Sequence, residues 1–165
     1  MKKGISLKNL TLCAMFIALS VAGAFIKPFG NSIAFDSLPA FLAASVMGPF
    51  FGAAVGFLGH LISASLAGFY LTLPIHLIIA VEMAFVMFIY GFLVKRTNLI
   101  VSGLVAVLLN GVAATAVFIL VPSMGIPFFL AMVGPLTIVS AINVVLAVLI
   151  HVSLEKSGFM KTIKR

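Results

Sequence analysis

The chain has 165 residues, of which 64% are hydrophobic and only 8% are charged, and its formal net charge is +7. A soluble domain carries roughly a quarter charged residues, so this composition excludes a water-soluble globular protein and favours an integral membrane protein. The basic residues form clusters between long apolar stretches, a pattern that orients membrane proteins rather than one that binds nucleic acid.

Six apolar segments follow one another along the chain, and each is expected to cross the bilayer as a helix. The first follows Lys2 and Lys3 as a signal peptide would, but it lacks a convincing cleavage site and is therefore interpreted as an uncleaved helix. The second is the least regular, because Asp36 and Pro39 interrupt it. The six predicted spans cover residues 10–26, 33–47, 50–67, 71–94, 99–121 and 128–154.

Nine of the ten basic residues fall into three clusters, and only Lys27 stands apart. An even number of spans places all three clusters on one side of the membrane, which the positive-inside rule identifies as the cytoplasm. We therefore predict an all-α polytopic membrane protein with six transmembrane helices, cytoplasmic termini and one substrate-binding domain over residues 1–165. The clusters are Lys2, Lys3 and Lys8; Lys95 and Arg96; and Lys156, Lys161, Lys164 and Arg165.

Small residues recur at helical spacing in the first span, where Ala14, Ala18 and Ala22 lie four residues apart. Such stripes allow helices to approach closely in lipid. The spacing alone fits packing inside one helix bundle, and it also fits a docking face for a second membrane protein.

Several kinds of chemistry have no signature in this sequence. There is no P-loop, no H-E-x-x-H motif and no G-x-S-x-G motif, which argues against ATP binding by a P-loop and against an enzyme. The three histidines are far apart in sequence and there is one cysteine, Cys13, so no disulfide, metal site or cofactor is expected.

Ionisable groups within a bilayer are costly and suggest a function by default. Glu82 falls near the middle of the fourth span and Asp36 near the outer end of the second. Glu82 fits either a ligand contact or a structural hydrogen bond, and His76, in the outer third of the fourth span, is a candidate ligand contact. His60 shares a helix face with Ser63, which favours a core histidine, and it is retained as a candidate contact.

Polar amides occur in the middle of the last two spans, Asn110 in the fifth and Asn143 in the sixth. Each amide must be satisfied in lipid, either by a neighbouring helix or by a ligand. Together with Glu82 they come from three successive helices, while the aromatic residues Phe35 and Tyr70 lie in the outer loops. This combination predicts an externally open pocket with an aromatic lid and a few polar anchors.

Two stretches carry a resemblance to a known family: the alanine repeat of the first span and the junction Val46-Met47-Gly48-Pro49-Phe50-Phe51-Gly52-Ala53-Ala54-Val55-Gly56. With six spans in a chain of this length, they resemble the S components, the substrate-binding subunits of energy-coupling factor (ECF) vitamin transporters. The resemblance covers the whole chain.

The resemblance implies a division of labour in a bacterial plasma membrane. The S component binds a water-soluble vitamin or precursor with high affinity, and a transmembrane coupling protein with two ATPase subunits supplies the energy. It also implies that Ala14, Ala18 and Ala22 form the docking face for the coupling protein. The segment from Lys27 to Asp36 would form part of the lid, and toppling of the subunit would carry the pocket inward.

The substrate is suggested by one further stretch, Leu73-Pro74-Ile75-His76-Leu77-Ile78-Ile79-Ala80-Val81-Glu82-Met83, which looks like the fourth helix of S components assigned to alpha-ribazole, a cobalamin precursor. The absence of an N-terminal Met-His argues against a cobalt or nickel S component. Other vitamins, such as pantothenate or a pyridoxine-like compound, remain alternatives.

Two other classes of function compete with this interpretation. A stand-alone secondary transporter would use Glu82 to couple transport to protons, although the two halves of the chain show no clear repeat. A membrane enzyme or regulatory scaffold would need a constellation of residues that the sequence does not show.

Overall fold

The computed structural model describes residues 6–26 and 34–164 of the chain, and this part contains helices and connections but no β-strand. The first four helices of the described chain are α1 (Leu7–Gly23), α2 (Ser37–Val46), α3 (Pro49–Leu66) and α4 (Leu73–Val94). A continuous helical run follows, made of α5 (Leu99–Val107), the π-helix η1 (Leu108–Ala113), α6 (Ala114–Val117) and the 3₁₀-helix η2 (Phe118–Leu120). The chain ends with α7 (Gly125–Lys156) and α8 (Phe159–Lys164).

Each of the six predicted spans corresponds to a helical segment, but the segments differ in length. Four of them are long and apolar enough to cross a bilayer, namely α3, α4, the run from Leu99 to Leu120, and α7. Helix α1 has 17 residues and α2 has only 10. A membrane crossing needs about 20 residues, so the count of six complete spans stays a prediction.

Helix α2 is shorter than the predicted span 33–47, of which residue 33 lies outside the described part. The helix begins only at Ser37, which places Pro39 in its first turn. Proline is tolerated there because the first backbone N–H groups of a helix have no intrahelical partner. Ten residues extend only about 15 Å, roughly half of the hydrocarbon thickness.

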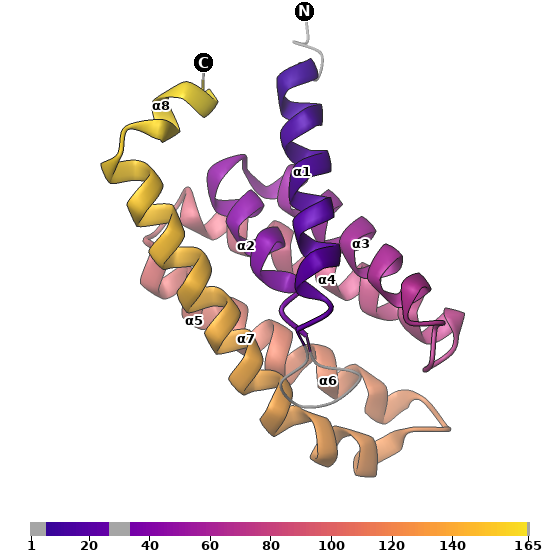
Figure 1. Cartoon of the computed structure of the whole chain (residues 1–165). Helices are drawn as coiled ribbons and strands as arrows, with labels where there is room; N and C mark the ends of the chain where they lie inside the picture. Colours follow the sequence, from indigo (N-terminus) through magenta and orange to yellow (C-terminus); the bar gives the residue numbers. More distant parts are fainter. Residues whose placement is uncertain (1–5, 27–33, 165) are drawn as a thin grey trace, which may run out of the picture.

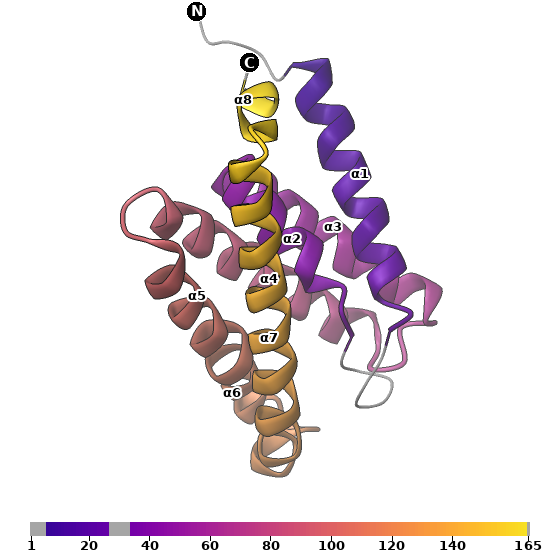
Figure 2. The ribbon, with the colours of Figure 1, turned by 60° about the vertical axis from the view of Figure 1, so that its left-hand side comes forward.

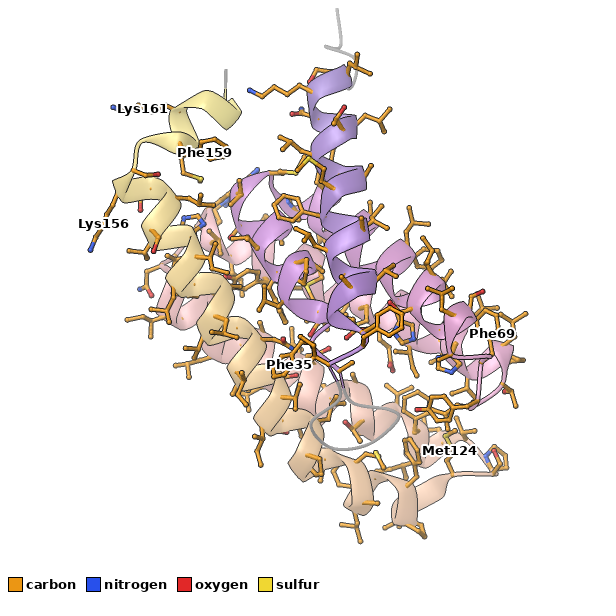
Figure 3. All side chains as sticks on the ribbon, viewed as in Figure 1. Phe35, Phe69, Met124, Lys156, Phe159 and Lys161 are labelled. Carbon is orange, nitrogen blue, oxygen red and sulfur yellow. The ribbon has the colours of Figure 1, made fainter. Side chains whose placement is uncertain are left out.

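The two ends of the described chain lie at the same end of the molecule (Figures 1 and 2). Lys156 and Lys161 lie there, whereas Phe69 in the α3–α4 connection and Met124 before α7 lie at the opposite end (Figure 3). The α4–α5 connection also belongs to the terminal end, because Lys95 lines a hollow there with His151 of α7. The described basic residues thus gather at one end, as the predicted topology requires, and the cytoplasmic location of that end stays a prediction.

Helix α2 is the centre of the packing. It contacts α1, α3, α4 and α7, and its residues Ala40, Phe41 and Ala43 are completely buried. The Phe41 ring meets the Tyr90 ring of α4 edge-on, with 5.3 Å between the ring centroids. Because other helices surround α2, its short length does not leave its ends facing lipid.

Close approach between helices depends on glycine at two positions around α2. A Cβ atom at Gly52 of α3 would collide with the Cα and Cβ atoms of Ala44 on α2. At Gly91 of α4 it would lie 2.8 Å from Pro49 Cα and 2.9 Å from the Ala44 carbonyl oxygen. Small residues at such contacts bring backbones together, which is how helices associate in lipid.

The outer faces of the long helices are apolar. Large hydrophobic side chains are exposed on α4, on the α5–η2 run and on α7, for example Phe85, Leu104 and Leu149. A water-soluble protein would bury side chains of this size, so this distribution suits a lipid surround.

Candidate functional site

A cavity of about 190 Å³ lies among α1, α2, α3, α4, the α5–η2 run and α7. It lies toward the end of the molecule opposite the termini, because Tyr70 and Leu71 of the α3–α4 connection line it, and Figure 3 places the neighbouring Phe69 at that end. Its polar lining comes from helices that are distant in sequence. The polar residues that line it are Asp36, Ser37, His60, Ser63, Tyr70, His76, Glu82, Asn110, Thr115, Ser140 and Asn143.

Two histidines on neighbouring helices form the first polar cluster. His60 Nε2 of α3 lies 3.2 Å from His76 Nδ1 of α4, which is hydrogen-bonding distance. His60 Nδ1 lies 3.6 Å from Asp36 Oδ2, an ion-pair contact if His60 is protonated. The three side chains form one line, Asp36–His60–His76, which we call the histidine relay.

Aromatic rings cover the His76 end of the relay. The ring centroids of Phe69 and Tyr70 lie 5.7 Å and 5.5 Å from that of His76. Phe69 has a φ of 48° and Thr72 a φ of 79°, values that residues other than glycine rarely adopt. The tight α3–α4 connection therefore holds its aromatic residues over the histidine at a conformational cost.

Glu82 contributes a carboxyl group from the middle of α4. Its Oε1 atom is buried and has no hydrogen-bond partner among the described residues. The Asp36–His60 contact is the one ion pair within the described residues, so none of their basic groups neutralises Glu82. A buried polar atom without a partner is expensive, which makes Glu82 Oε1 a candidate acceptor for a ligand.

Asn110 and Asn143 present amides from the last two long helical segments. Asn110 donates from Nδ2 to Ser140 Oγ at 2.5 Å, and it belongs to the π-helix η1, a departure from α-geometry that often marks functional sites. Asn143 donates from Nδ2 to Ser37 Oγ at 2.7 Å. Its Oδ1 atom is buried and without a partner among the described residues, so it offers a second free acceptor.

The remaining wall of the cavity is apolar and flanks the polar anchors. Phe118 of η2 and Phe128 of α7 meet edge-on, with 5.5 Å between ring centroids, and Met132, Leu136 and Val139 continue the surface along α7. A cavity with one apolar wall and a few polar anchors suits a small organic molecule that is part ring and part hydrogen-bonding group.

Seven of the eight candidate binding residues from the sequence line this cavity: Asp36, His60, Tyr70, His76, Glu82, Asn110 and Asn143. Phe35 does not belong to the lining. Its backbone N–H donates to the Ile26 carbonyl at 3.1 Å, so the residue joins the α1–α2 connection to the end of α1.

Several lining residues were not predicted from the sequence, including Ser37, Thr115, Ser140, Phe118 and Phe128. Two of them had a usable signal, since Ser37 follows Asp36 directly and Ser140 lies three residues before Asn143 on one helix face. The contact between His60 and His76 also had a signal in the sequence. The two histidines are equally distant from Gly68 in the tight α3–α4 connection, so two antiparallel helices would bring them to the same level.

The described residues contain no group of three histidine, cysteine or acidic side chains that could hold a metal ion. The alanine stripe lies outside the cavity, and Ala14, Ala18 and Ala22 are all exposed on α1. Cys13 lies beside this stripe as a buried free thiol.

Comparison with known proteins identifies the family of the chain. A comparison with curated proteins gave no match. Residues 8–155 match the family described as "ECF transporter, substrate-specific component". Members of this family are transport subunits rather than enzymes, and they work with ECF coupling and ATPase modules on a small-molecule substrate. The chain therefore belongs to the family of ECF transporter substrate-specific components, as a multi-pass integral protein of the bacterial plasma membrane.

Proposed function

We propose that the chain captures alpha-ribazole in the cavity described above and presents it to the ECF coupling module for import. The observation that carries the proposal is that Glu82 Oε1 and Asn143 Oδ1 are buried acceptor atoms without described partners in a cavity with an apolar wall. Ribose hydroxyls would donate to these acceptors, and the dimethylbenzimidazole ring would pack against Phe118 and Phe128.

The charge of the lining favours a neutral solute over an anionic one. Two carboxyl groups, Asp36 and Glu82, line the cavity, and no lysine or arginine does so within the described part of the chain. A carboxylate-bearing vitamin such as pantothenate would meet repulsion from Glu82, which has no ion-pair partner among the described residues. The resemblance of the segment Leu73–Met83 to alpha-ribazole S components supports the same choice.

The sequence similarity also supports a role for α1 in assembly. Ala14, Ala18 and Ala22 are exposed and line up on one helix, so they could receive a helix of the coupling protein at short distance. The six-span topology with cytoplasmic termini belongs to the same proposal, since it opens the cavity toward the outside.

A calorimetric titration of the purified chain tests the substrate. Alpha-ribazole should bind at one site per chain, and pantothenate at the same concentrations should give no heat of binding. Equal binding of both compounds, or binding of pantothenate alone, would contradict the proposal. Uptake into proteoliposomes should need the coupling protein and ATPases, and uptake by this chain alone would instead support a secondary transporter.

A further inference from the structure

The histidine relay fixes how many protons two buried rings carry. With 3.2 Å between His60 Nε2 and His76 Nδ1, only one proton lies between the two nitrogens. Two bare nitrogens would repel each other through their lone pairs, and two N–H groups would collide. The hydrogen-bonding role of the remaining nitrogen, His76 Nε2, therefore depends on the proton content of His60.

Asp36 decides that proton content from the other side. Its Oδ2 atom faces His60 Nδ1 at 3.6 Å, so this nitrogen must carry a proton to avoid repulsion by the carboxylate. If His60 were neutral, its Nε2 would be bare, His76 would donate from Nδ1, and His76 Nε2 would be an acceptor. If His60 is a cation, both of its nitrogens carry protons, its Nε2 donates to His76 Nδ1, and His76 Nε2 then carries the proton of that ring as a donor.

Charge balance selects between the two states. Asp36 lines the cavity, whereas Lys95 and Lys156 lie at the terminal end of the molecule. His60 is the one basic group in ion-pair contact with Asp36 among the described residues. An unpaired carboxylate among membrane helices is costly, and one extra proton on the relay neutralises it. The other titratable groups of the cavity lining are Tyr70 and Glu82, and no ion pair joins Glu82 to either histidine within the described residues.

We infer that Asp36 holds His60 as a cation, that His60 donates to His76 Nδ1, and that His76 therefore presents an Nε2–H donor to the substrate. His76 is 97% buried, from an exposed fraction of 3%, and its Nε2 has no partner among the described residues, so this donor awaits an acceptor on the bound molecule. Asp36 and His60 act as positioning residues, and His76 is the contact residue.

This inference rests on the proposed function and narrows its substrate class. Among the described residues, the buried cavity atoms without a partner are a donor at His76, acceptors at Glu82 and Asn143, and the Ser63 hydroxyl, which can donate or accept. A matching solute carries an acceptor nitrogen or oxygen at one end and two donors, such as hydroxyls, at the other. Alpha-ribazole has this polarity, because the unsubstituted nitrogen of its benzimidazole ring accepts and its ribose hydroxyls donate.

Nitrogen-15 NMR of histidine-labelled protein tests the relay without any ligand, because bare, protonated and cationic ring nitrogens have distinct shifts. At neutral pH we expect both nitrogens of His60 to be protonated, and His76 to be protonated at Nε2 only. In Asp36→Asn, His60 should lose its second proton. In the matched variant Glu155→Gln, which changes an exposed carboxyl at the terminal end, the His60 and His76 signals should stay unchanged. A singly protonated His60 in the wild type, a proton on His76 Nδ1, or a cationic His60 in Asp36→Asn would overturn the inference.

Binding provides a second arm. The probes are alpha-ribazole and its indole analogue, in which a C–H group replaces the acceptor nitrogen. Asp36→Asn should weaken alpha-ribazole binding roughly tenfold, since His60 loses its second proton and no longer holds His76 in the form that donates from Nε2. The analogue should bind the wild type and Asp36→Asn within about twofold of each other. Equal loss for both probes would overturn the inference. Failure of alpha-ribazole to bind the wild type would refute the proposed substrate. The ligand-free NMR experiment would then still test the protonation states of the histidine relay.

Discussion

Glu82 and Asn143 each hold a buried acceptor atom of the cavity without a described partner, and the Ser63 hydroxyl is also unpartnered there. We predict that substrate binding depends most on Glu82 and Asn143. Other polar side chains of the lining are already engaged, such as Asn110 with Ser140. Folding leaves the two acceptors unsatisfied at a cost, and a ligand that donates to them recovers it.

We predict that Glu82→Gln lowers the affinity for alpha-ribazole about tenfold, because the amide keeps the size of the side chain but replaces a carboxylate acceptor by a weaker one. Isothermal titration calorimetry measures the change. Glu155→Gln is the control, since Glu155 is exposed near the end of α7 and should leave the affinity unchanged. Equal affinities of wild type and Glu82→Gln would remove Glu82 from the binding site.

Ser37→Ala should lower the free energy of unfolding by about 1–3 kcal/mol, because it leaves the buried Nδ2 group of Asn143 without its 2.7 Å partner. Thermal unfolding in detergent provides the measurement. Ser153→Ala is matched to it, since Ser153 is exposed and bonds only within its own helix, to Leu149 O. We expect a change within about 0.5 kcal/mol there. Similar losses in both variants would mean that the Ser37–Asn143 bond contributes nothing specific.

At the scale of helices, α2 and its neighbours form the frame on which the site is built. Asp36 and Ser37 stand at the start of α2, and the rest of this helix is locked between α3, α4 and α7. Since Gly52 allows α3 to approach Ala44 of α2, the packing of these two helices sets the distance between Asp36 and His60.

Gly52→Ala should therefore destabilise the protein by about 1–3 kcal/mol, because the added methyl group overlaps the Ala44 backbone and side chain in a well-packed contact. Gly134→Ala on α7 is the matched control. A Cβ there meets nothing within 4 Å, and the helix propensity gained by alanine is opposed by the following Pro135, so stability should change by less than about 1 kcal/mol. Thermal unfolding of the two variants decides the point, and a stable Gly52→Ala protein would refute the close contact.

The apolar segments of the sequence predicted the positions of most helices. The features that they did not predict depend on tertiary contacts or on local changes of helix type. The predicted third span, 50–67, and the observed α3, Pro49–Leu66, differ by one residue at each end. The ten-residue α2 was not predicted, because its burial among other helices removes the need to cross the bilayer alone. The π-helix around Asn110 was also missed, since the hydrophobic pattern of the sequence does not reveal a local change of helix type.

The candidate site was predictable as a set of residues more than as a geometry. Costly polar groups in apolar spans marked Glu82, Asn110 and Asn143, and all three line one cavity. The partners Ser37 and Ser140 were missed, because serine is common in membrane helices and signals no cost by itself. The contact between His60 and His76 follows from the antiparallel pairing of α3 and α4, which single-residue reasoning did not use.

For the whole molecule, family membership divides the work between this chain and its partners. The chain supplies the cavity, and the ECF module supplies coupling and ATP hydrolysis. The exposed alanine stripe on α1 and the cavity share no residue, so docking and capture can be separated by mutation.

We predict that Ala18→Leu abolishes co-purification with the coupling protein and uptake in proteoliposomes, because the larger side chain keeps the partner helix at a distance. The affinity for alpha-ribazole should stay within about twofold of the wild type, because the residue lies outside the cavity. Leu19→Phe enlarges an exposed neighbour outside the stripe and should preserve the complex. An intact complex with Ala18→Leu would remove the stripe from the interface.

Native mass spectrometry of the chain released from detergent tests solute capture most directly. With alpha-ribazole present, the wild type should carry one added mass equal to that of alpha-ribazole per chain. The double variant Glu82→Gln/Asn143→Ala, with its helical content verified by circular dichroism, should be detected without bound alpha-ribazole. A wild type that never retains the solute, or a folded double variant that retains it equally well, would contradict the assignment of this cavity as the binding site.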